Sequence, residues 1–156
     1  MLEDKRDEVM QALRQQLDHI MEFQLNDIEK ALVLAGANFL ATQGAVVCTE
    51  FLGGIYGGTL TQRGVERDRF EAGLRLLGAD YVSVSNDLWD LRCSLLHSYL
   101  PHGRPGRYYY FINDPDSPHG FFREVDAAKG QERIVVNPRV WVRDLKAAYA
   151  KLVQVL

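Results

Sequence analysis

Cysteine is scarce in this chain of 156 residues, which contains only Cys48 and Cys93. Both lie in apolar sequence, and neither belongs to a C-x-x-C pair. The pattern excludes a disulfide-stapled scaffold and a zinc ribbon of the usual spacing. We therefore expect free thiols in a reducing, cytoplasmic protein that has neither a metal site nor a cofactor.

An excess of positive charge and a long unbroken apolar run are also missing. The formal net charge is −3, which excludes a nucleic-acid-binding surface that is basic overall. The apolar stretch Ala31–Cys48 is interrupted by Asn38 and Thr42, which is typical of a buried helix rather than a membrane span. The charged segment Met1–Glu8 is not typical of a signal peptide. We expect no contact with a membrane.

What the sequence does have is helical periodicity. It predicts one mainly α domain over residues 1–156, with a helical bundle over 1–100, a β element with loops over 101–136 and a closing helix over 137–156. The apolar spacing predicts four helices before the β element, at Glu3–Phe23, Asn26–Leu52, Gln62–Leu77 and Asn86–Leu100. The second of these is apolar on most sides, which indicates a dimer.

Local signals set the expected boundaries of these helices. Asn26 and Glu29 form a capping-box pattern, Ser85 is a good N-cap, and Gly78 suits a helix end. The run GGIYGG after Leu52 predicts a tight connector. The β element is expected as a small hairpin-type sheet with strands at Tyr108–Ile112, Phe121–Val125 and Arg133–Val136, followed by a helix at Asn137–Val155.

Arg92 is the residue that most needs an explanation. At about 100° per residue, it falls near the centre of the apolar side of its helix. A guanidinium keeps its proton inside a protein, so an unpaired buried arginine is costly. Arg92 therefore pairs with a core acid such as Glu50, lies in a solvated cleft or faces an anionic ligand. His97 lies roughly 140° further around the helix, beside Asp90.

The residues Arg92, His97 and Tyr99 form an R-x4-H-x-Y pattern on one helix. This pattern resembles the signature of the HEPN superfamily. The resemblance implies a four-helix bundle, a homodimer whose two motifs share one cleft, and a metal-independent endoribonuclease that is often a toxin. It also implies an antitoxin or a nucleotidyltransferase as partner, with Tyr99 as the residue that such an enzyme modifies. Cys93 departs from the family, which usually has a polar residue at this position.

The chemistry of RNA cleavage matches these residue types. His97 has the pKa range of a general base or acid for attack by the 2′-hydroxyl, and Arg92 can stabilise the charge on phosphorus. Further contacts to substrate are expected from Tyr99, and from a basic turn that contains His102, Arg104 and Arg107. Asp90 either orients His97 or is solvated.

A second hypothesis needs no catalysis. The same fold then serves as an inactive dimeric module that binds a nucleotide or a protein partner, with Arg92 as anion anchor or structural ion pair. The net negative charge and Cys93 favour this hypothesis, whereas the spacing of Arg92 and His97 favours the ribonuclease. In this reading His97 is a surface histidine near a helix end.

Overall fold

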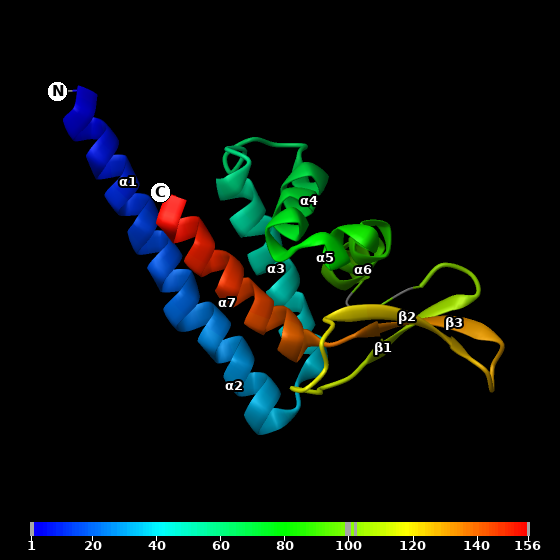
Figure 1. Cartoon of the computed structure of the whole chain (residues 1–156). Helices are drawn as coiled ribbons and strands as arrows, with labels where there is room; N and C mark the ends of the chain where they lie inside the picture. Colours follow the sequence, from blue (N-terminus) through cyan, green and yellow to red (C-terminus); the bar gives the residue numbers. More distant parts are fainter. Residues whose placement is uncertain (1, 99–100, 102, 156) are drawn as a thin grey trace.

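The computed structural model describes residues 2–98, 101 and 103–155, and it is mainly helical with one small sheet (Figure 1). Tyr99 and His102 therefore lie outside the described residues. The elements in chain order are α1 (Leu2–His19), η1 (Ile20–Leu25), α2 (Asn26–Ala35), α3 (Asn38–Tyr56), α4 (Glu66–Leu77), α5 (Ala79–Ser83), α6 (Ser85–Ser98), β1 (Arg107–Phe111), β2 (Phe121–Asp126), β3 (Gln131–Val136) and α7 (Pro138–Val155).

The first helical segment is longer than predicted. α1 passes through one π-helical stretch, η1, directly into α2, so the chain stays helical up to Ala35. The capping box predicted at Asn26 is wrong. Asn26 has helical φ and ψ angles, and its side chain donates to the Glu22 carbonyl oxygen at 3.0 Å. An asparagine that bonds a carbonyl four residues back continues a helix instead of starting one.

The long helix predicted over Asn26–Leu52 is in fact two helices. The break lies at Gly36, which has the left-handed φ of 61° that ends a helix. Its N–H donates to the carbonyl oxygen of Leu32 at 3.2 Å. The apolar character that continues through this break reflects burial of α3 rather than one unbroken helix.

The predicted GGIYGG connector is also wrong in part, because α3 continues to Tyr56 and includes Gly53. A Cβ atom at Gly53 would lie 1.8 Å from the backbone oxygen of Arg69 on α4. A Cβ atom at Gly73 would lie 2.0 Å from the backbone oxygen of Thr49 on α3. The glycines therefore let the two helix backbones touch, which fixes the position of α4 against α3.

α4 begins at Glu66 rather than at the predicted Gln62, and Gly78 ends it as predicted. The N–H of Gly78 donates to the Leu74 carbonyl oxygen at 3.1 Å. The short helix α5 was not predicted. Ser85 is the first residue of α6 rather than its N-cap.

The sheet has the strand order β1-β3-β2. β2 and β3 form an antiparallel hairpin, whereas β1 runs parallel to β3. Figure 1 shows the sheet reaching away from the helices, with α7 returning from β3 to lie along α1 and α2. The side chain of Asn113, after β1, donates to the carbonyl oxygen of Leu32 at 3.0 Å and so ties the sheet to the end of α2.

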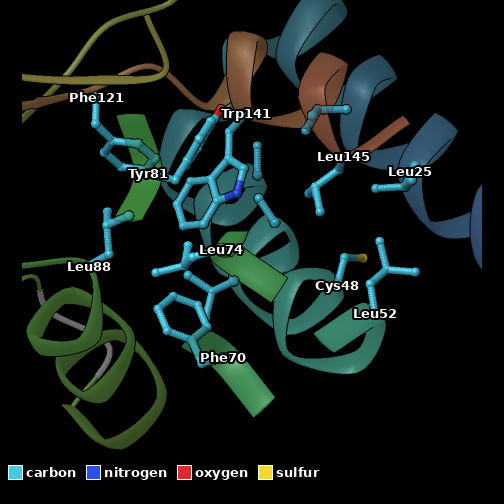
Figure 2. Close-up of a cluster of buried hydrophobic side chains, with 14 of the residues drawn as sticks. Leu25, Cys48, Leu52, Phe70, Leu74, Tyr81, Leu88, Phe121, Trp141 and Leu145 are labelled. Carbon is cyan, nitrogen blue, oxygen red and sulfur yellow. The ribbon is translucent and has the colours of Figure 1, made fainter. Parts of the chain in front are cut away.

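One hydrophobic core joins the helices to the base of the sheet. Trp141 of α7 packs edge-on against Phe121 of β2, with ring centroids 4.6 Å apart, and also contacts Tyr81 of α5 (Figure 2). The Trp141 indole N–H donates to the Thr49 hydroxyl at 3.1 Å. Within the described residues, no helix is long and apolar enough to cross a membrane.

Candidate functional site

Arg92 is held by an ion pair with Glu50. Its Nε and Nη2 donate to one carboxylate oxygen of Glu50 at 3.0 and 2.7 Å. Only 8% of Arg92 is exposed. The pairing that the sequence left open is therefore present, and it brings α6 against the middle of α3. The catalytic role of Arg92 stays a prediction.

Trp89 lies on the other side of this guanidinium. The centre of its ring is 4.9 Å from Cζ of Arg92 and 5.7 Å from Cζ of Arg67. The ring also packs against Phe70 in the core, at 6.0 Å between centroids. Stacking on Trp89 holds the Arg92 side chain in place without neutralising its charge.

Arg69 of α4 completes the charged cluster. Its Nη1 donates to the Leu60 carbonyl oxygen at 3.0 Å, but its Nη2 lies 3.7 Å from Glu50 and 3.6 Å from Glu66. Both ion-pair distances exceed those of a hydrogen bond. Among the described residues, none accepts a hydrogen bond from the buried Nε of Arg69. Arg69 is thus less completely bonded than Arg92.

Sequence analysis missed Arg69. Its helix carries a mixture of arginines and acids, which is typical of a solvated face. One signal was available, since Gly73 follows Arg69 by four residues and therefore lies on the same face of the helix. A glycine on that face marks the line where another backbone comes close.

The cluster borders a cavity of about 280 Å³ between α3, α4 and α6. Two guanidinium groups and the carboxylate of Glu50 line it, Glu66 lies 3.6 Å from Arg69 outside the lining, and the rest of the wall is apolar. The lining residues are Val47, Glu50, Phe51, Leu60, Arg69, Arg92 and Leu96. An apolar cavity with a fixed cation suits an anionic group better than a neutral one.

A second cavity of about 560 Å³ lies on the other side of Val47 and Leu96, which line both cavities. Its polar groups are the side chains of Gln24, Asp27 and Gln43. Val47 and Leu96 thus lie between two cavities along α3 and α6, the first lined by the arginines and the second by Asp27. We call the two cavities together the α3–α6 groove.

The structure separates His97 from the support predicted for it. His97 is exposed in the last turn of α6. Asp90 instead accepts a hydrogen bond from Nε of Arg104 at 2.5 Å. This bond raises the pKa of Arg104, and the role of Asp90 toward His97 stays a prediction.

Arg107 is likewise committed to the fold. It pairs with Glu132 on the neighbouring strand and lies 3.3 Å from the buried carboxylate of Asp87. Arg123 of β2 also donates to Asp87, and the Tyr109 hydroxyl donates to the Asp87 backbone oxygen at 2.7 Å. These bonds attach the sheet to the first turn of α6. Binding of substrate by Arg104 and Arg107 stays a prediction, in which both would also have these acidic partners.

The cysteines do not form a reactive pair. Both are free thiols, and Cys48 is buried beside Gln24 in the second cavity. Burial raises the pKa of Cys48 to about 12, because the thiolate would lose its hydration. Across residues 2–98, 101 and 103–155, no group of three or more His, Cys, Asp or Glu side chains is placed to hold a metal ion.

Comparisons with known proteins match this chain to no family model, no curated protein and no solved structure. The arguments for function therefore rest on the α3–α6 groove and on the pattern of residues in α6.

Proposed function

We propose that this chain is a non-catalytic helical module that binds an anionic group of a nucleotide or of a protein partner between Arg69 and Arg92. The observation that carries the proposal is the incomplete bonding of Arg69. Its Nη2 lies more than 3.5 Å from both nearby carboxylates, at the wall of a cavity that Arg92 also lines.

The physical argument rests on the distances around Arg69. Arg92 donates both of its hydrogen bonds to Oε2 of Glu50, whereas Oε1 of Glu50 lies 3.7 Å from Nη2 of Arg69, beyond hydrogen-bond distance. An incoming carboxylate or phosphate oxygen can bond to Arg69 without displacing that pair. Charge-assisted hydrogen bonds of this kind are about twice as strong as neutral ones.

The test is a titration with sodium acetate and sodium phosphate, each against sodium chloride at the same ionic strength. We expect the Nε–H signal of Arg69 in a ¹⁵N-edited NMR spectrum to shift saturably, together with the indole signal of Trp89. Arg75 is an exposed arginine on the same helix, so Arg75→Gln is the matched control and keeps the response. In the Arg69→Gln variant, the Trp89 indole signal no longer shifts. A protein in which neither anion moves these signals lacks the proposed function.

A metal-independent endoribonuclease of the HEPN type is the second proposal. It is supported by the exposure of His97 at the end of the helix that carries Arg92. In this proposal the helices form a HEPN-like bundle, two chains pair in the cytoplasm, and Arg92 exchanges Glu50 for a phosphate. His97 then transfers the proton of the 2′-hydroxyl.

Incubation of purified protein with single-stranded RNA in EDTA tests this proposal. Cleavage products with 2′,3′-cyclic phosphate ends, lost in both Arg92→Ala and His97→Ala, support it. The His119→Ala variant removes a histidine of the loop before β2 and serves as control. Intact RNA at high protein concentration rejects catalysis and leaves the binding proposal standing.

A further inference from the structure

We infer that the loop between α3 and α4, residues 57–65, is a lid on the cavity of about 280 Å³ and that Arg69 holds this lid closed. The inference goes beyond the proposed function, because it concerns access to the cavity rather than the group that binds there. Its evidence is the place of Leu60 in the cavity wall, the attachment of the loop to Arg69 and the glycines near the ends of the loop.

Leu60 brings the loop into the wall of the cavity. The loop sits directly on α3 at this point, since a Cβ atom at Gly54 would lie 3.1 Å from Cδ1 and 3.3 Å from Cα of Leu60. Gly54 therefore provides the seat for Leu60. Residues 61–64, by contrast, are exposed. The loop thus covers the cavity with a half-buried apolar side chain, and displacement of that side chain opens the wall.

Two attachments of the loop lead to Arg69 of α4. Nη1 of Arg69 donates to the carbonyl oxygen of Leu60 at 3.0 Å. Further along the loop, the N–H of Gly64 donates to Oε1 of Glu66 at 3.3 Å, and this oxygen lies 3.6 Å from Nη2 of Arg69. The backbone N–H groups of Glu66 and Gly64 lower the pKa of Glu66, so its carboxylate stays charged at neutral pH. Loss of the Arg69 guanidinium therefore weakens the loop at two places.

The loop has a glycine near each end that allows it to move. Gly58 and Gly64 have φ angles of 63° and 75°, and nothing lies within 4 Å of a Cβ atom built at either. Glycines change such angles at little steric cost, and loops with few buried contacts open far more easily than the whole fold. The loop can therefore swing while α3 and α4, which touch at Gly53 and Gly73, stay packed.

The experiment is limited trypsin digestion of the full chain, followed by mass spectrometry. Arg63 is an exposed residue of the loop, and the rate of cleavage after it follows how often the loop opens. Cleavage after Lys30, an exposed residue of α2, reports opening of the rest of the fold. We expect Arg69→Gln to speed cleavage after Arg63 about tenfold relative to cleavage after Lys30, the value of one charge-assisted hydrogen bond.

A second variant opens the lid without a change at Arg69 or at the cleavage site. Gly58→Ala places a side chain at a left-handed φ of the closed loop, so we expect about tenfold faster cleavage after Arg63. Gly130→Ala makes the same change at a φ of 61° between β2 and β3, and Arg75→Gln removes an exposed arginine of α4. Both controls leave cleavage after Arg63 unchanged.

The inference is overturned if cleavage after Arg63, relative to Lys30, is as slow in Arg69→Gln as in the native chain. It is also overturned if Gly58→Ala has no greater effect than Gly130→Ala. No anion takes part in the digestion, so a failed titration with acetate and phosphate rejects the proposed function and leaves the lid standing. Saturable NMR shifts together with an unchanged digestion give the reverse result.

Discussion

Removing the charge of Glu50 tests the charged cluster most directly. In the Glu50→Gln variant, Arg92 keeps one neutral acceptor but loses its counter-ion while it remains 92% covered. Breaking a buried ion pair costs about 3–5 kcal/mol. The cavity beside the cluster admits water and Gln retains a hydrogen bond, so we expect about 2–3 kcal/mol of lost stability. This is a large part of the roughly 5–15 kcal/mol that stabilises an ordinary domain.

The assay is urea unfolding at low salt, followed by tryptophan fluorescence, to which Trp89, stacked on Arg92, and the buried Trp141 both contribute. Glu8→Gln makes the same chemical change at an exposed position of α1 and is expected to cost less than about 0.5 kcal/mol. Arg92→Gln alone is expected to cost about 3 kcal/mol. The double variant at positions 50 and 92 is expected to cost about the same as Arg92→Gln alone, which gives a coupling energy of about 2–3 kcal/mol.

Phosphate should partly rescue Glu50→Gln. The vacated carboxylate position leaves two guanidinium groups facing one cavity, and an anion that binds only the folded state stabilises it. At a phosphate concentration ten times the dissociation constant, the gain is about 1.4 kcal/mol. The idea that Glu50 and the arginines form one electrostatic unit is refuted by two results together. The first is that the stability losses of Glu50→Gln and Arg92→Gln simply add in the double variant. The second is that phosphate and chloride stabilise Glu50→Gln equally.

Three other changes test the fold around the site. Gly53→Ala should cost well over 3 kcal/mol of stability in urea unfolding, because its Cβ meets the α4 backbone. The control Gly130→Ala has a φ of 61° but nothing within 4 Å of its Cβ, and should cost only about 1–2 kcal/mol. Equal costs of the two variants contradict the close packing of α3 against α4. Asp87→Asn should speed hydrogen exchange in β1 and β2 more than in α7, because Arg123 loses its carboxylate partner and Arg107 keeps only Glu132. At pH 8.5, iodoacetamide should alkylate Cys93 well before Cys48, as followed by mass spectrometry, because burial raises the pKa of Cys48 to about 12; equal rates contradict this.

The sequence was a good guide where a pattern is local. Helical spacing located most of α1, α4, α6 and α7, and β-branched and aromatic runs located the strands. It failed at Asn26 and Gly36, because capping residues and glycines act according to the backbone angles that their surroundings impose. It also failed at Gly53, where a helix that packs against another backbone tolerates a residue that otherwise ends helices.

For the candidate site, the sequence by itself determined that a permanently charged group lies on the apolar side of a helix and must have a partner. That conclusion follows from helical periodicity and from the basicity of arginine alone. Only the tertiary structure decided which partner Arg92 takes, that Arg69 joins it, and that Arg104 and Arg107 bond to acids of α6 and β3. These contacts join residues far apart along the chain, and their distances depend on how closely α3, α4 and the sheet pack. Helical periodicity in the sequence shows which face of a helix a side chain occupies, but not which residue from a distant part of the chain contacts it.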